Sequence, residues 1–96
     1  MGAGEGRSRL VVNRYRIEFR PAALRELRKL DRSAQPRIQG AISLLAQDPR
    51  PPASRPLRGR DGYRLRIGDY RIIYTISDGV LLIVVVTIGH RREVYQ

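Results

Sequence analysis

The sequence has few or none of the residues that many functional classes require. It contains no cysteine, which excludes a disulfide framework, a thiolate nucleophile and a cysteine-ligated metal. It has one histidine, His90, and we find no His/Asp/Glu cluster spaced for a metal. Its longest apolar run, Val80 to Val86, falls far short of the roughly 20 residues that a membrane-spanning helix needs. We therefore expect a cytoplasmic protein with no metal, no cofactor and no membrane contact.

Acidic residues are also scarce. The 96 residues include 9 Asp and Glu against 19 Lys and Arg, a formal net charge of +10. An excess of this size attracts polyanions and speeds their association. Lys29 is the only lysine, and arginine binds phosphate through planar bidentate hydrogen bonds that lysine cannot form. The expected partner is therefore a nucleic acid or an acidic protein.

The length predicts one domain. Residues 1–12 are polar and glycine-rich at the start, and their apolar residues do not recur at the spacing of a helix or a strand. We therefore expect a disordered extension over residues 1–12 and a folded domain over residues 13–96. Tyr15, Ile17 and Phe19 alternate with charged residues, which predicts a half-buried strand.

Two amphipathic helices are predicted after this strand. Pro21 suits the first turn of the first helix, whose apolar stripe consists of Ala23, Leu24, Leu27 and Leu30. Ser33 is the predicted N-cap of the second helix, whose apolar face holds Ile38, Ala41, Ile42 and Leu45. The pattern indicates an antiparallel helical hairpin with one apolar side.

The remainder is predicted as a connector and three strands. Four prolines between positions 49 and 56 indicate an extended connector without regular structure. Strands follow at residues 63–67, 70–76 and 80–88, joined by turns at Gly68-Asp69 and Ser77-Asp78-Gly79. The predicted fold is α+β, a small antiparallel β-sheet of about four strands with the N-terminal helical hairpin packed on one face.

The turns fix the expected register of the arginines. A two-residue turn at Gly68-Asp69 places Arg66 directly opposite Arg71, with Arg64 one step further along the same face. Like charges placed opposite each other destabilise a sheet, so we expect an anion to be bound there. A two-residue turn at Asp78-Gly79 would pair Arg71 with Val86 and bring His90 onto the same face.

Each of these residues also has a structural interpretation. Arginines on surface strands commonly serve solubility and edge protection. A lone histidine such as His90 is more often structural than catalytic, although histidine is the side chain type most often used as a general acid or base. Tyr95 serves equally well as an anchor of the C-terminus or as a ring that stacks on a nucleotide base.

Several segments together resemble the RelE branch of the RelE/ParE toxin superfamily. They are Tyr15 to Phe19, Ala23 to Leu30, Asp48-Pro49, Leu57-Arg58-Gly59, Gly68 to Tyr74, Gly89-His90-Arg91 and Val94-Tyr95. The resemblance implies a metal-free mRNA interferase that cuts codons in the ribosomal A site through attack of the ribose 2′-OH on the adjacent phosphate. The catalytic residues it implies are Arg71, Arg91, Tyr95 and His90, and the RNA-binding residues are Arg58, Arg64, Arg66 and Arg92.

One departure from that family concerns the general base. Arg64 and Arg66 occupy positions where the family often has lysines, and a guanidinium cannot deprotonate because its pKa exceeds about 12. Activation of the 2′-OH is then left to His90, Tyr95 or the ribosome.

The resemblance also implies partners and a rival function. The partners are a cognate antitoxin, in a heterodimer or heterotetramer, together with the ribosome and mRNA. The alternative is a ParE-like toxin that binds and poisons DNA gyrase without cleaving RNA. A third possibility is a nontoxic binding module of the same fold.

Overall fold

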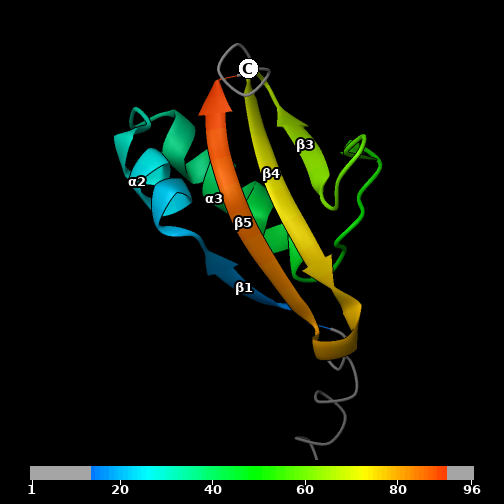
Figure 1. Cartoon of the computed structure of the whole chain (residues 1–96). Helices are drawn as coiled ribbons and strands as arrows, with labels where there is room; N and C mark the ends of the chain where they lie inside the picture. Colours follow the sequence, from blue (N-terminus) through cyan, green and yellow to red (C-terminus); the bar gives the residue numbers. More distant parts are fainter. Residues whose placement is uncertain (1–13, 91–96) are drawn as a thin grey trace, which may run out of the picture.

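A computed structural model describes residues 14–90 (Figure 1). Its elements, in chain order, are β1 (Arg16–Phe19), α2 (Pro21–Lys29), α3 (Ala34–Leu45), β2 (Ser54–Pro56), β3 (Tyr63–Ile67), β4 (Tyr70–Ser77), the short 3-10 helix η1 (Asp78–Val80) and β5 (Leu82–His90). The predicted extension over residues 1–12 lies outside the described residues, as do Arg91, Arg92 and Tyr95.

The strands form one five-stranded sheet in the order β1-β5-β4-β3-β2. The predicted α+β class with both helices on one face is confirmed, but the sheet has five strands and not four. The fifth is β2, which lies inside the proline-rich connector that was predicted to have no regular structure. The sheet is also mixed, because β1 runs parallel to β5 while all other neighbours are antiparallel.

The core lies between the sheet and the two helices. Figure 1 shows α3 behind the long central strands β4 and β5, with α2 beside β5. Alternate residues of the strands face these helices, because successive side chains of a strand point to opposite faces. The fully buried residues on the two sides of this contact include Ala23, Ile38, Leu45, Ile72, Tyr74, Ile83, Val85 and Ile88. We call this face of the sheet the helix side and the opposite one the arginine face.

Hydrogen bonds to backbone carbonyl oxygens hold the connection between α2 and α3. Ser33 stands at the predicted N-cap position of α3, but its side chain makes no capping hydrogen bond. Instead, the backbone N–H groups of Ala34 and Gln35 donate to the Asp31 carbonyl oxygen at 3.0 and 3.1 Å. The Gln35 side-chain amide donates to the Leu30 carbonyl at 3.3 Å. These bonds satisfy groups that a helix end otherwise leaves without partners.

The connection between β4 and β5 differs from the predicted two-residue turn. The chain passes through η1 and then through Leu81, which adopts a positive φ of 53°, so that Ser77 pairs with Leu82 rather than Val80. A β-bulge between Ile73 and Tyr74 shifts the register again. Arg71 therefore lies opposite Gly89 and not opposite Val86 as predicted.

A polar network ties together the end of the sheet at η1. The Asp78 carboxylate accepts a hydrogen bond from the Tyr15 hydroxyl at 2.6 Å and from Arg50 Nη2 at 2.8 Å. Arg50 also donates from Nε to the Tyr63 hydroxyl at 3.0 Å. The bonds from Arg50 and then from Tyr15 lower the pKa of Asp78. The network joins the β1, α3–β2, β3 and η1 segments.

Two adjacent leucines of α3 test the position of the core. Leu45 is fully buried and Leu44 is 65% exposed. Leu45→Ala is expected to lower the free energy of unfolding by about 2–5 kcal/mol because it leaves a cavity. Leu44→Ala, the same chemical change at a solvent-facing position, is expected to change it by no more than about 0.5 kcal/mol. Urea titration of both variants measures the difference, and equal losses would contradict the described packing.

The Asp78 network predicts a pH dependence of stability. Because the pKa of Asp78 is lower in the folded chain, its carboxylate stabilises the fold above the unfolded pKa of about 3.9, and this contribution is lost as pH falls below that value. Asp78→Asn lacks the contribution at every pH. The melting temperature of the variant is therefore expected to lie below that of the wild type at pH 7 and to approach it near pH 3. A difference that does not change with pH would contradict the network.

Candidate nucleic-acid interface

Four arginines line one hollow on the arginine face. The hollow has a volume of about 280 Å³ and is lined by Ala53, Arg55, Arg64, Arg66 and Arg71. We call it the arginine hollow. Its side chains come from three neighbouring strands, β2, β3 and β4, so their spacing is set by backbone pairing.

The register places these arginines in two cross-strand pairs. Arg66 of β3 lies directly opposite Arg71 of β4, as predicted, and Arg55 of β2 lies directly opposite Arg64 of β3. Like charges that face each other across two strands repel and destabilise the sheet. Two such pairs side by side therefore concentrate positive potential in a small volume, which is the arrangement that binds an anion.

Arg71 is the most deeply placed of the four. Its relative exposure is 5%, whereas Arg64 is half-buried and Arg55 and Arg66 are exposed. A guanidinium stays protonated at any pH a protein tolerates, so Arg71 contributes a fixed charge inside the fold. A buried charge acts over its surroundings with less screening than an exposed one. An anion in the arginine hollow would meet this fixed charge at the bottom and the more exposed arginines at the rim.

Sequence reasoning identified Arg64, Arg66 and Arg71 but missed Arg55. These three were predictable because a two-residue turn fixes the register of β3 against β4. Arg55 lies among prolines, whose presence argued against a strand. The available signal was the position of Pro56 at the end of a three-residue edge strand, where a missing N–H is tolerated.

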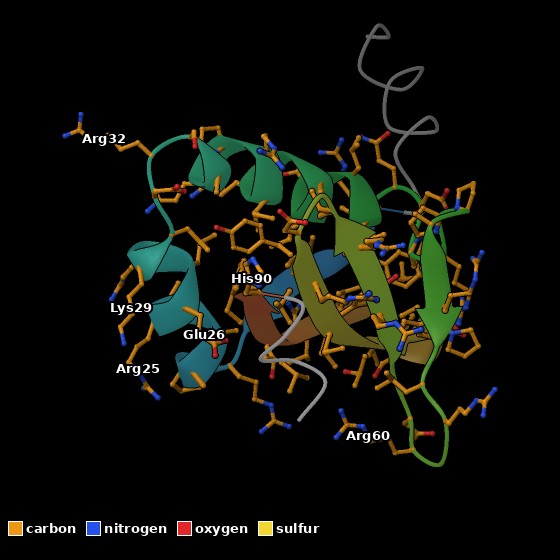
Figure 2. All side chains as sticks on the ribbon, turned by 90° about the horizontal axis from the view of Figure 1, so that it is seen from above. Arg25, Glu26, Lys29, Arg32, Arg60 and His90 are labelled. Carbon is orange, nitrogen blue, oxygen red and sulfur yellow. The ribbon has the colours of Figure 1, made fainter. Side chains whose placement is uncertain are left out.

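His90 lies on the other side of the sheet from the arginine hollow. It pairs with Tyr70, and the neighbouring pair on this face, Ile72 and Ile88, is buried against the helices. Figure 2 shows His90 beside α2, on the same side as Glu26. The prediction that His90 shares a face with the arginines is therefore wrong. The connection through η1 shifts the pairing by two residues, which keeps side chains on the predicted face, but the bulge between Ile73 and Tyr74 shifts it by one more and moves His90 to the helix side.

The surroundings of His90 form a separate pocket of about 400 Å³. Its lining consists of Glu26, Lys29, Leu30, Asp31, Tyr70, Ile88, Gly89 and His90. The rings of Tyr70 and His90 meet edge to face, with centroids 5.7 Å apart. Glu26 Oε1 accepts a hydrogen bond from the Ile88 backbone N–H at 2.8 Å. Because β1 pairs with β5 only as far as Val85, Glu26 takes the place of a strand partner for Ile88.

The other predicted site residues lie elsewhere. Arg58 is exposed in the loop between β2 and β3 and does not line the arginine hollow. Arg91, Arg92 and Tyr95 are beyond the described residues, so their predicted roles stay predictions.

Within residues 14–90, no group of three or more His, Cys, Asp or Glu side chains is arranged to hold a metal ion. Over the same range, no helix has the length and apolar character needed to cross a membrane.

Comparison with known proteins places this chain in a family. Residues 17–95 match the family model described as the ParE toxin of the type II toxin–antitoxin system parDE. A RelE-like toxin protein of Escherichia coli is 36% identical over 83 residues, which cover 83% of this chain and 86% of the relative. The mRNA interferase toxin RelE of Escherichia coli K12 is 33% identical over 87 residues, covering 85% of this chain and 90% of the relative.

Solved structures agree with these sequence matches. The isolated RelE toxin of Escherichia coli superposes with a TM-score of 0.71 at 30% identity, covering 84% of this chain and 90% of that one. The toxin–antitoxin complex RelBE2 of Mycobacterium tuberculosis gives a TM-score of 0.71 at 28% identity, covering 81% of this chain and 99% of that one. The chain therefore belongs to the RelE/ParE superfamily of type II toxin–antitoxin toxins, and its relatives there are RelE proteins.

Proposed function

We propose that this toxin is a ribosome-dependent endoribonuclease that cleaves mRNA in the ribosomal A site and so inhibits translation. The observation that carries the proposal is the arginine hollow, which gathers four guanidinium groups on one face of the sheet. A phosphodiester is the anion that arginine recognises best in nucleic acids, through paired N–H donors. The similarity to an mRNA interferase supports RNA as the substrate.

The proposed reaction needs no metal. The ribose 2′-oxygen attacks the adjacent phosphorus, the bond from phosphorus to the 5′-oxygen breaks, and the products are a 2′,3′-cyclic phosphate and a 5′-hydroxyl. Negative charge builds on the phosphoryl oxygens in the transition state. Arg71 and Arg66, opposed across β3 and β4, are positioned to stabilise that charge. Arg91 is proposed for the same role, and Tyr95 for stacking on the nucleotide, from the family resemblance.

Within residues 14–90, the lining of the arginine hollow includes no side chain that accepts a proton. Its charged residues in that range are four arginines, which cannot act as general bases. His90 faces the helix side, with the sheet between it and the hollow. We therefore propose that the proton of the 2′-OH passes to Tyr95 or to a group of the ribosome, and that His90 is not the base.

A cognate antitoxin is the proposed regulatory partner. Similar toxins are seen in complexes with RelB antitoxins. The net charge of +10 favours an acidic partner whose carboxylates neutralise the arginine face. The toxin would then act in the cytoplasm once it is released from the antitoxin.

Replacing Arg71 tests the proposed role of the arginine hollow. Arg71→Ala is expected to lower mRNA cleavage by about 100-fold or more, because it removes a buried charge that stabilises the transition state. The measurement is primer extension on mRNA translated in a cell-free system with purified toxin. Arg32→Ala is the matched control, because Arg32 points into solvent from the segment between the helices (Figure 2) and carries the same charge.

Two further results complete this test. Thermal melting of Arg71→Ala separates lost chemistry from lost folding, and Arg71→Lys keeps the charge at the same position. Cleavage by Arg71→Ala at the wild-type rate would contradict the proposed site. Intact mRNA together with broken DNA, from the wild-type toxin, would indicate the gyrase-poisoning function instead.

The placement of His90 gives a separate prediction. His90→Gln is expected to change the cleavage rate by no more than a few-fold, because the side chain lies on the helix side. A general base contributes roughly 100-fold or more, so the two roles are well separated in magnitude. Single-turnover cleavage on ribosomes with a defined A-site codon measures the rate. A loss of about 100-fold in a folded variant would show that His90 takes part in the chemistry.

A further inference from the structure

We propose that the arginine hollow binds two consecutive phosphates of the RNA strand, with Arg66 and Arg71 on the scissile phosphate and Arg55 and Arg64 on its neighbour. The inference rests on the RNA substrate proposed above. It adds a second phosphate subsite and assigns a binding role to Arg55, a residue of the edge strand β2.

The spacing of the two arginine pairs supports two phosphates. Arg64 and Arg66 are two residues apart on β3, so their Cα atoms are separated by about 6.7 Å along the strand. This is comparable to the separation of consecutive phosphates along an extended single strand of RNA. Each of the two has an arginine directly opposite it on the neighbouring strand, Arg55 for Arg64 and Arg71 for Arg66. The four arginines therefore form two cross-strand pairs that follow one another along β3, and they do not surround a single position.

Arg55 is held in place by its own strand. Its Nη1 atom donates to the carbonyl oxygens of Pro52 and Ser54 at 2.7 and 2.8 Å. The Ser54 hydroxyl and backbone N–H both donate to the Pro51 carbonyl oxygen, at 2.7 and 2.9 Å. These bonds and the adjacent prolines restrict the segment, so little side-chain freedom is lost when a ligand binds.

The hydrogen bonds leave one edge of the Arg55 guanidinium for a ligand. Both bonds use Nη1, and the Nε and Nη2 atoms form the edge that binds two oxygens of one phosphate. If Arg55 served only to protect an edge strand, a mobile side chain in solvent would suffice. The combination of a fixed guanidinium and a position in the wall of the arginine hollow indicates a binding role.

The test uses a trinucleotide, which has two internucleotide phosphates. Every ribose has a 2′-O-methyl group, so the RNA cannot be cleaved. Each phosphate in turn is replaced by an uncharged methylphosphonate, and the affinity of the free toxin for each trinucleotide is measured by NMR titration at low salt. The bases are identical throughout. For each replaced phosphate, the Kd of the modified trinucleotide is divided by the Kd of the unmodified one, and this ratio reports the contribution of that phosphate.

The expected result is that Arg55→Ala changes the response of the toxin to one of the two phosphate replacements and not to the other. Wild-type toxin is expected to bind several-fold more weakly when either phosphate is neutralised. In Arg55→Ala the effect of one of the two replacements is expected to become several-fold smaller, because Arg64 is then the only arginine of that pair left to sense the charge. The salt dependence of the log affinity for the unmodified trinucleotide is expected to fall by about 0.7 in slope, the value for one phosphate on a single strand. Arg32→Ala, the matched control in the segment between α2 and α3, is expected to keep both ratios and the slope.

The outcomes separate this inference from the proposed function. If Arg55→Ala keeps both ratios of the wild type, the second subsite is wrong while phosphate recognition by the hollow stands. If the wild type responds to neither replacement, the hollow does not bind RNA phosphate, and both proposals fail. Arg55→Gln, which keeps the length and polarity of the side chain, is expected to behave like Arg55→Ala; a wild-type response there would also overturn the assignment.

Discussion

The alternation of side chains along β3 and β4 is the constraint on which the rest of the structure depends. Leu65, Ile72 and Tyr74 are buried against the helices, and this burial directs Arg64, Arg66 and Arg71 to the opposite face. Burying a large apolar side chain stabilises a fold by about 1.5–3 kcal/mol. An unfavourable cross-strand pair costs less, roughly 0.2–1 kcal/mol. The hydrophobic contribution therefore outweighs the repulsion, and the sheet keeps its arginines on one face.

The two ends of the sheet differ in how they are held. At the η1 end, Asp78 is bonded to Tyr15 and Arg50, and Arg50 also donates to the Tyr63 hydroxyl, so four segments are joined by short polar contacts. At the other end, Glu26 replaces a strand partner for Ile88 and links α2 to the last residues of β5. The arginine hollow is formed by strands between these two anchored regions. Groups on paired strands keep their spacing better than groups on loops, and a preorganised site costs less reorganisation when charge develops in a substrate.

The sequence predicted those parts of the site that depend on short-range geometry. The pairing of Arg66 with Arg71 follows from a two-residue turn and was correct, since few other registers are compatible with Gly68-Asp69. The predicted position of His90 was wrong because the bulge between Ile73 and Tyr74 shifts the pairing by one residue, which the turn motif does not reveal. In such a strand a shift of one residue moves a side chain to the other face.

Arg55 shows a different limit of sequence reasoning. Its place in the hollow depends on β2, a three-residue strand that is stabilised by pairing with β3 and not by its own residue preferences. Prolines within a short segment argue against a strand unless it lies at the edge of the sheet, and the edge position is known only once the other strands are placed. The charge excess pointed to the anion, but only the assembled sheet shows which arginines surround it.

The central claim is that the arginine hollow stabilises a cleaving RNA phosphate. The most direct measurement is the chemistry of mRNA ends after wild-type toxin acts on ribosomes with a defined A-site codon. The account predicts cuts within that codon that leave a 2′,3′-cyclic phosphate and a 5′-hydroxyl, and no cuts when the A site is empty of mRNA. Ends with a 5′-phosphate, or mRNA that stays intact while growth stops, would contradict it.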